Sequence, residues 1–191
     1  DEFVVVDMWK GLLAVGSVCT GYDLAMHRIE FWRDIPTPFG ELRLAVDSDG
    51  GLHSGWKTIG RHPQGGRYDP ALREDIARWV ESTMAGKWTP PPAFEIPRTT
   101  PFRTRCLEAC RSIPPGKTIS YRELAELAQQ PGAARAAGSA MRHNHTPLLV
   151  PCHRVIRSNG AIGGFAGQMT CGDPAVLLKS RLQELERSTV V

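Results

Sequence analysis

The residues best suited to chemistry in this chain lie in the stretch LLVPCHRVIRSNGAIGGFAG, at positions 148–167. Cys152 is followed directly by His153 and Arg154. A cysteine attacks as its thiolate, and a neighbouring imidazole or guanidinium favours that form. Adjacent side chains of an extended chain point apart, so a bend at Pro151 has to bring the imidazole back, directly or through a water molecule. The pair fits nucleophilic catalysis, while a structural cysteine is the alternative that the pair alone leaves open.

The residues on either side of this pair indicate how it is held. Residues 148–150 are apolar and lie between Pro147 and Pro151, which predicts a buried strand or an extended entry to Cys152. The letters SNG at 158–160 are typical of a turn. The segment GGFAG at 163–167 can lie flat against a planar ligand with its backbone amides exposed.

Composition sets the class of protein that carries these residues. The chain has 191 residues, 41% hydrophobic and 23% charged, which suits one large or two small globular domains. A net charge of +3 is too small to establish a nucleic-acid partner by itself. The 5 cysteines are scattered without a CxxC pair, so neither a zinc ribbon nor a disulfide framework is indicated. This usage predicts a reducing, cytoplasmic location, or a nuclear one in a eukaryote.

The first residues show no targeting pattern. No apolar stretch is long enough to span a bilayer, so we expect no membrane partner. Asp1, Glu2 and Asp7 stand where a signal peptide needs basic residues. The sequence after Met26 reads like the start of a domain, so we expect residues 1–25 to be an extension without function. A strand formed by FVVV at 3–6 is the alternative.

The chain then divides into two parts, predicted as 26–98 and 99–191. Residues 28–59 favour strands, because ELRLAV at 41–46 alternates apolar and polar residues between turn-forming segments. Residues 69–86 predict a helix that Asp69 caps, with Pro70 in its first turn and Gly86 at its end. WTPPPAF at 88–94 is typical of a linker.

The second part favours short helices. Residues 101–113 predict a helix that turns Cys106 and Cys110 into the core. Ser120 and Glu123 form a capping box before a second helix, with Leu124, Leu127 and Ala128 on its inner face. QPG ends that helix, and another runs from about 133 to 142. Two short helices around a tight turn are typical of a helix-turn-helix.

The last of these helices, AARAAGSAMR, is unusual for reading DNA bases. It lacks the long polar side chains that a major-groove helix uses, apart from Arg135 and Arg142. Its small residues allow close approach to the minor groove, where an arginine can replace a displaced base. Tight packing against a neighbouring helix is the alternative explanation.

These features together resemble the O6-alkylguanine-DNA alkyltransferase family. PCHRV at 151–155, ISYRELAELA at 119–128 and PGAARAAGSAMRHN at 131–144 carry the resemblance, which is dense over 101–168 and looser over 28–100. It implies an α/β N-terminal domain, with a small antiparallel sheet plus a helix, ribonuclease H-like in fold. A mostly α, winged helix-turn-helix-like DNA-binding domain would follow.

The resemblance also implies the chemistry. Cys152 would take the alkyl group from O6 of a flipped guanine in a single, irreversible turnover without a cofactor, and O4-alkylthymine is a further possible substrate. His153 would activate the thiol through a water molecule, Asn144 would brace the active-site turn, and Tyr121 would help to protonate the departing base. The substrate pocket would be lined by Val155, Phe165, Ala166 and Gly167.

The implied partner is double-stranded DNA, bound by a monomer through the minor groove. Arg135 would fill the gap that the flipped base leaves in the stack. The other residues implied at the DNA are Ser120, Ala133, Ala134, Gly138 and Arg142.

Two departures from the family pattern stand out. Aligning Leu177 and Leu178 with the family places Arg181 where a glutamate completes a Cys–water–His–Glu chain, and Glu184, one turn further, is the expected substitute. Cys171 is also unusual at its position, and we interpret it as a bystander.

Some family members hold zinc in the N-terminal domain. His53 matches a ligand position, but Asp47 stands where a cysteine is needed, so we predict no metal.

Three other functions remain open at this stage. An alkylated-base sensor without transfer would fit Arg181, although relatives of that kind carry Trp or Ala where Cys152 stands. A Cys–His hydrolase would leave the helix-turn-helix unexplained. A transcription regulator would have no need of Cys152.

Overall fold

The computed structural model describes residues 28–170 and 172–189, so the expectations for 1–25 and Cys171 lie outside the described residues. The first part of the chain forms a sheet in the order β3-β2-β1-β4. Its strands are β1 (Ile29–Ile35), β2 (Leu42–Asp47), β3 (Leu52–Trp56) and β4 (Arg67–Tyr68). β1, β2 and β3 pair antiparallel, but β4 runs parallel to β1. The sheet is therefore mixed, and the prediction of an antiparallel sheet holds only for its first three strands.

The alternation in ELRLAV places its apolar side chains in the core, as predicted. Leu42 and Leu44 are fully buried, while Arg43 between them is only half-buried and pairs with Asp34 on β1. The turn after β2 closes around Asp47, whose Oδ1 accepts hydrogen bonds from the backbone of Asp49 and Gly51. A short 3-10 turn, η1 (Lys57–Ile59), follows β3.

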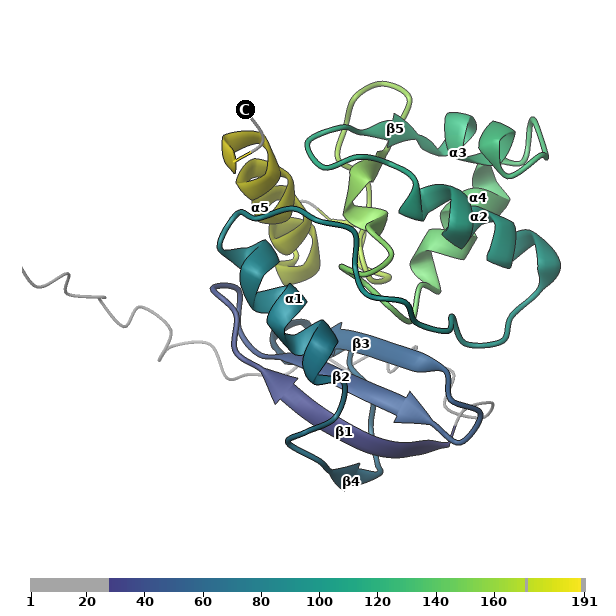
Figure 1. The fold of residues 1–191 in the computed structure, drawn as a ribbon. Coiled ribbons are helices and arrows are strands. Elements are labelled where there is room, and N and C mark those ends of the chain that lie inside the picture. The colour runs from purple at the N-terminus through teal and green to yellow at the C-terminus, as the bar shows by residue number, and fades with distance from the viewer. Residues whose placement is uncertain (1–27, 171, 190–191) are drawn as a thin grey trace, which may run out of the picture.

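The helix of this half, α1 (Glu74–Met84), begins later than predicted. Asp69 accepts a hydrogen bond from the backbone of Ala71 and so caps a turn rather than the helix. The helix end agrees with the prediction, because Gly86 adopts φ +84° just beyond it. The stripe of Ile76, Trp79 and Val80 is buried against the sheet (Figure 1).

The helices of the second half follow the predicted order. They are α2 (Pro101–Arg111), α3 (Tyr121–Leu127) and α4 (Ala134–Arg142). Both hydrogen bonds of the Ser120–Glu123 capping box form, at 3.2 and 2.6 Å. Cys106 and Cys110 are fully buried core residues, as expected, whereas Leu127 is 57% exposed and not on the inner face.

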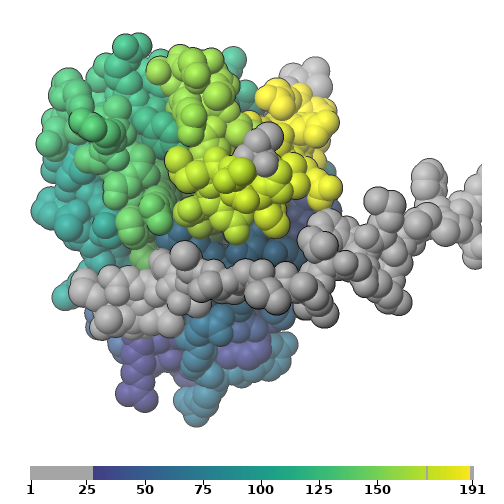
Figure 2. All heavy atoms as spheres, turned by 180° about the vertical axis from the view of Figure 1, so that it is seen from behind, coloured from purple at the N-terminus to yellow at the C-terminus, as the bar shows by residue number. Residues whose placement is uncertain are grey.

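The remaining elements complete the second half, and the last of them contacts the first half. β5 (Ile119–Ser120) pairs parallel with β6 (Val155–Ile156), which follows the 3-10 turn η2 (Cys152–Arg154). The last helix, α5 (Pro174–Thr189), returns to lie beside α1 (Figure 1). There Trp88 donates a hydrogen bond to Thr189 at 2.7 Å. Seen from behind, the segment after β6 lies beside the α3–α4 region, above the strands (Figure 2).

A helix that crosses a membrane must be long and apolar. Within residues 28–170 and 172–189, no helix is long and apolar enough to cross a bilayer.

Candidate active site

Cys152 begins a single turn of 3-10 helix, in which the backbone N–H of Arg154 donates to the carbonyl of Pro151 at 2.9 Å. The chain therefore bends at the position that the sequence indicates. The preceding residues 148–150 are buried, but they are not a strand. Leu148 has φ +76°, and the N–H of Val150 donates to the carbonyl of Thr146 at 2.8 Å, which makes the entry a tight turn. A residue other than glycine in this conformation is a strained position that its surroundings must hold.

Asn144 braces this turn, as predicted. Its Nδ2 donates to the carbonyl of Val150 at 2.9 Å and to Sγ of Cys152 at 3.1 Å. Its Oδ1 accepts from the backbone N–H and the hydroxyl of Thr146. One buried amide therefore fixes both the backbone of the turn and the sulfur.

The partner of His153 is Glu186, which corrects the prediction for Glu184. Nε2 of His153 donates to Oε1 of Glu186 at 2.7 Å, and both side chains are buried. Glu184 and Arg181 are exposed. The alignment on Leu177 and Leu178 was misplaced: α5 runs five residues beyond Arg181 before its buried face brings a carboxylate to the imidazole.

Glu186 is further anchored by Arg154 and by the backbone of Gly116. Arg154 donates to both carboxylate oxygens, at 2.8 to 3.2 Å, and the N–H of Gly116 donates to Oε2 at 2.9 Å. Burial would raise the pKa of Glu186, but the hydrogen bonds from His153 and Arg154 and the positive charge of Arg154 lower it to about 2. The group is therefore an ionised acceptor at neutral pH.

Because Glu186 can only accept, His153 carries its proton on Nε2. Burial lowers the pKa of His153, so the imidazole is neutral and Nδ1 is an acceptor. Nδ1 is buried and has no hydrogen-bond partner among the residues that the structure describes. His153 thus has a free basic nitrogen and a carboxylate that stabilises its protonated form.

Burial raises the pKa of the Cys152 thiol, so the resting group is a thiol rather than a preformed thiolate. The hydrogen bond from Asn144 and the charges of Lys179 and Arg61 act in the opposite direction. Reaction at Cys152 consequently requires a base, which makes the adjacent imidazole more important than the sequence alone suggested.

Sequence reasoning missed the inner face of α5. Lys179, Gln183 and Glu186 lie on that face at i, i+4 and i+7, and all three are buried. Lys179 donates to the carbonyls of Val155 and Gly164, at 2.5 and 3.3 Å, and Gln183 donates to the carbonyl of His153 at 2.6 Å. The signal was present as three polar residues at the spacing of one helix face.

A cavity of about 680 Å³ opens in front of Cys152. It brings together nine of the predicted site residues, namely Tyr121, Ala134, Arg135, Gly138, Arg142, Cys152, Phe165, Ala166 and Gly167. Val155 is fully buried and does not line this cavity. Its carbonyl instead accepts the Lys179 bond, so Val155 supports the site from behind.

The pocket loop is a tight turn rather than a flat glycine strip. Phe165 and Gln168 exchange two backbone hydrogen bonds of 2.9 Å, and the central residues Ala166 and Gly167 have φ +47° and +86°. Positive φ at both positions is the signature of a type I′ turn. Opposite, the ring of Tyr121 forms another wall, and burial raises its pKa to about 12, so its hydroxyl remains a donor.

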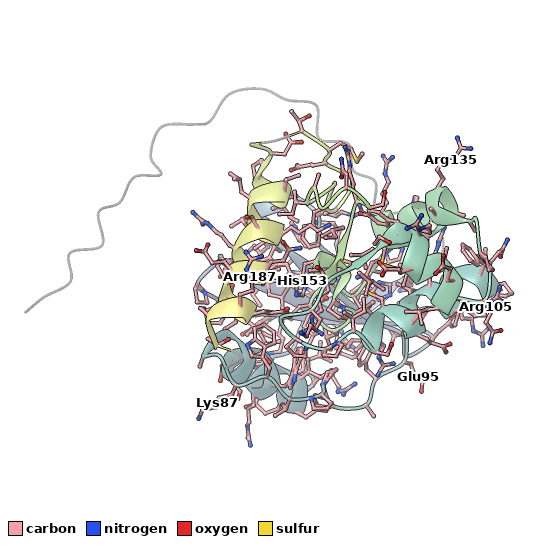
Figure 3. All side chains as sticks on the ribbon, turned by 90° about the horizontal axis from the view of Figure 1, so that it is seen from above. Lys87, Glu95, Arg105, Arg135, His153 and Arg187 are labelled. Carbon is pink, nitrogen blue, oxygen red and sulfur yellow. The ribbon has the colours of Figure 1, made fainter. Side chains whose placement is uncertain are left out.

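The residues predicted at the DNA occupy different settings. Arg135 is exposed and points away from the protein, whereas His153 lies deep inside it (Figure 3). Arg142 is also exposed, at the end of α4. Ala133 precedes α4 as its N-cap residue, and the hydroxyl of Ser120 caps α3.

The donor set near His53 does not fit a zinc site in the described part of the chain. Nε2 of His53 lies 2.7 Å from Oδ2 of Asp47, and both are buried. Between residues 28 and 189, position 171 excepted, no group of three His, Cys, Asp or Glu residues could hold a metal ion.

Comparison with known proteins identifies relatives of the chain. Residues 101–188 match the family model for the DNA-binding domain of 6-O-methylguanine DNA methyltransferase. The methylated-DNA–protein-cysteine methyltransferase of Mus musculus is 62% identical over 52 residues, 27% of this chain and 25% of that protein. The chain thus aligns with only a quarter of that relative's length.

A second relative covers far more. The Mycobacterium tuberculosis protein of the same name is 33% identical over 164 residues, 82% of this chain and 92% of that protein. A crystal structure of Mycobacterium tuberculosis OGT in complex with DNA matches with a TM-score of 0.71 at 32% identity, over 83% of this chain and 94% of that one. The chain belongs to the O6-alkylguanine-DNA alkyltransferase, or methylated-DNA–protein-cysteine methyltransferase, family.

Proposed function

We propose that this protein repairs DNA by transferring the alkyl group from O6 of guanine to Sγ of its own Cys152. The observation that carries the proposal is the arrangement around the sulfur. Cys152 faces a cavity, Asn144 bonds its Sγ at 3.1 Å, and the His153–Glu186 pair at 2.7 Å lies behind it. The names of the relatives, all methylated-DNA–protein-cysteine methyltransferases, support the same activity.

The first step removes the thiol proton. It passes through a water molecule to Nδ1 of His153, while Glu186 stabilises the imidazolium that forms. The donated bond from Asn144 and the positive charges of Lys179 and Arg61 stabilise the thiolate in a site that otherwise opposes charge.

The second step transfers the alkyl group. The Sγ–carbon bond forms as the O6–carbon bond breaks, and the guanine leaves with the electron pair of that bond. Tyr121 donates its phenolic proton to the departing base, and the proton held by His153 restores charge balance. Cys152 ends as a thioether, so each molecule acts once, and no cofactor takes part.

The DNA is bound through its minor groove by the small-residue face of α4. Ala134 and Gly138 line the cavity mouth, where their lack of bulk favours close approach of a backbone. Arg135 projects outward from the same helix and fills the space of the flipped base. Ala133, at the start of α4, belongs to the same proposed interface, whereas Ser120 is buried as the N-cap of α3 and would act through the position of that helix. The protein acts as a monomer.

The architecture that supports this function is a ribonuclease H-like domain, 26–98, joined to a winged helix-turn-helix-like domain, 99–191. The mixed sheet with α1, and the α3–α4 pair with the short β5–β6 ladder, support this division. The unpaired state of Cys106, Cys110 and Cys152 supports a reducing compartment, cytoplasmic or nuclear.

The proposal excludes a lesion sensor that lacks transfer. The sequence argument for a sensor was Arg181 in place of the family glutamate. Glu186 occupies the required position at His153, so that argument no longer holds.

Intact-protein mass spectrometry tests the activity. The chain is incubated with a duplex containing O6-methylguanine, and a gain of about 14 Da on one thiol is expected. Peptide mapping should place the methyl group on Cys152. Cys152→Ala should bind the same duplex without any gain, and unmodified guanine in the duplex serves as the second control.

Either of two results would contradict the proposal. A protein that binds the lesion but gains no mass is a sensor. A protein whose gain maps to another cysteine uses a different nucleophile.

A further inference from the structure

Arg61 belongs to the first half of the chain, yet its side chain reaches the active-site loop of the second half. It follows η1, and its backbone is seated directly on β3, where a Cβ added to Gly55 would lie 2.2 Å from the Arg61 carbonyl oxygen. That contact leaves room only for glycine. The position of Arg61 is therefore set by the sheet.

The guanidinium of Arg61 packs against the tight turn of the pocket loop. A Cβ added to Gly167 would lie 3.2 Å from Nη1 of Arg61 and 3.7 Å from Nε of Arg142. Gly167 has φ +86°, so the turn presents bare backbone to the two arginines. One arginine comes from each half of the molecule, and both meet at this turn.

Arg61 and Cys152 also line a second, small hollow. Four residues line both this hollow and the main cavity, namely Cys152, Met141, Phe165 and Ala166. The first half contributes Ser54, Ile59 and Arg61 to its walls. The second half adds Asn144, Pro147 and those four residues. The guanidinium thus approaches Cys152 from behind the pocket loop.

We propose that Arg61 is a positioning residue through which the N-terminal sheet holds the 165–168 turn against Cys152 and places a positive charge beside its thiolate. The proposal rests on Cys152 being the nucleophile of the proposed function. It explains why a half of the protein without catalytic residues packs against the site.

Charge at Cys152 comes from several elements. Lys179 from α5 and Arg61 lower its pKa, and it interacts electrostatically with Cys110 of α2 and Tyr121 of α3. His153 follows it in η2. Arg61 is the contribution from the sheet half, so its substitution isolates that half's effect on the thiol.

The test measures thiol ionisation without DNA. Alkylation of Cys152 by iodoacetamide is followed from pH 6 to 10 in the full chain, and peptide mapping separates Cys152 from the other cysteines. Arg61→Met should raise the pH midpoint of the alkylation rate and slow alkylation at pH 7.5 by about three- to tenfold. Arg61→Lys, which keeps the charge, should retain the original midpoint. Arg67→Met, an exposed site on β4, is the control for lost charge.

Transfer kinetics provide the second measurement. With an O6-methylguanine duplex, Arg61→Met should slow methyl transfer while its DNA affinity matches that of Arg67→Met. Arg61→Lys should transfer at an intermediate rate, because an ammonium lacks the planar fork that packs on the turn.

The proposal is overturned if Arg61→Met has the same midpoint and transfer rate as Arg67→Met. Failure of the proposed function would look different, since the duplex would then leave no methyl group on the unmodified chain. Because alkylation by iodoacetamide needs no DNA, its pH midpoint tests the role of Arg61 even if the protein transfers no methyl group. Circular dichroism checks that Arg61→Met folds. If it does not fold, Arg61→Lys decides instead: because it keeps the charge, a raised pH midpoint of alkylation in this variant would overturn the proposed role of the charge.

Discussion

The chemistry of this site depends on which of several nearby residues faces which. Cys152, His153 and Arg154 are consecutive, yet the 3-10 turn separates the thiol from the other two side chains. The thiol faces the cavity, and the imidazole and guanidinium both meet Glu186. Glu186 therefore has two tasks, to orient His153 and to neutralise Arg154.

Replacing Glu186 tests the first task. Glu186→Gln keeps the shape but removes the charge that stabilises protonated His153, so the single-turnover transfer rate should fall by about 10²-fold. Quenched-flow transfer from an O6-methylguanine duplex measures this rate. Glu184→Gln, two residues earlier on the exposed side of α5, should transfer at the unmodified rate; a comparable fall in that variant would contradict the assignment.

The low pKa of Glu186 also makes stability depend on pH. Its pKa is about 2 in the folded protein and near 4.5 in the unfolded chain. Between these pH values the unfolded chain binds a proton that the folded protein does not. The stabilising effect of the carboxylate is therefore lost as pH falls from about 4.5 to 2. The advantage of the unmodified protein over Glu186→Gln in free energy of unfolding should therefore shrink by about 2 kcal/mol between pH 7 and pH 3. Urea unfolding at the two pH values measures it, and a constant difference would show that the carboxylate is not held ionised.

At the scale of elements, α5 supplies the support of the site. Lys179, Gln183 and Glu186 contact β6, the pocket loop and η2 from one buried face. Burial lowers the pKa of Lys179 to about 8, while the neighbouring thiols Cys152 and Cys110 act to raise it. A buried lysine bonded to two backbone carbonyls thus supports the pocket from behind, as Val155 does.

Removing this ammonium should loosen the pocket. Lys179→Met leaves the carbonyls of Val155 and Gly164 without their donor, which should cost about 1–3 kcal/mol in free energy of unfolding and slow methyl transfer. Thermal unfolding and the transfer assay measure the two effects. Lys87→Met, an exposed site, is the matched control; equal stability of the two variants would show that the Lys179 bonds are unimportant.

At the scale of the molecule, the two halves meet around the active site. α5 lies beside α1, and β3 joins the active-site segment through Ser54, whose N–H donates to the carbonyl of His145 at 2.8 Å. Arg135 and Arg142 of α4 are exposed and line the same cavity as Cys152. The helix proposed to contact DNA therefore lies beside the sulfur that the two halves support.

The exposed arginine of α4 gives a prediction at this scale. Arg135→Ala should weaken binding of duplex DNA and lower the slope of log affinity against log salt by about one. Transfer from a free O6-alkylguanine base, which needs no flipping, should be unchanged. Fluorescence anisotropy over a salt series measures the slope. Arg78→Ala, an exposed arginine of α1, should leave both slope and affinity unaltered.

The sequence by itself determined the features that depend on neighbouring residues. The Ser120–Glu123 capping box, the stop at Gly86 and the bend at Pro151 all form where the local pattern places them. The sequence also predicted Cys152 and His153 from their adjacency, and the resemblance predicted the bracing role of Asn144, which its hydrogen bonds confirm. The same local reasoning identified the family.

Only the tertiary structure decided the features that depend on packing between distant segments. Glu186 lies 33 residues beyond His153 in the sequence. Which carboxylate of α5 meets the imidazole depends on the rotation of this helix about its axis. An error of one residue in the alignment changes that rotation by about 100°. The approach of Arg61 to Gly167 depends on how one half docks on the other. The late start of α1 and the parallel β4 likewise follow from packing, because Arg67 and Asp69 bond to β1 and Asp69 then caps a turn before the helix.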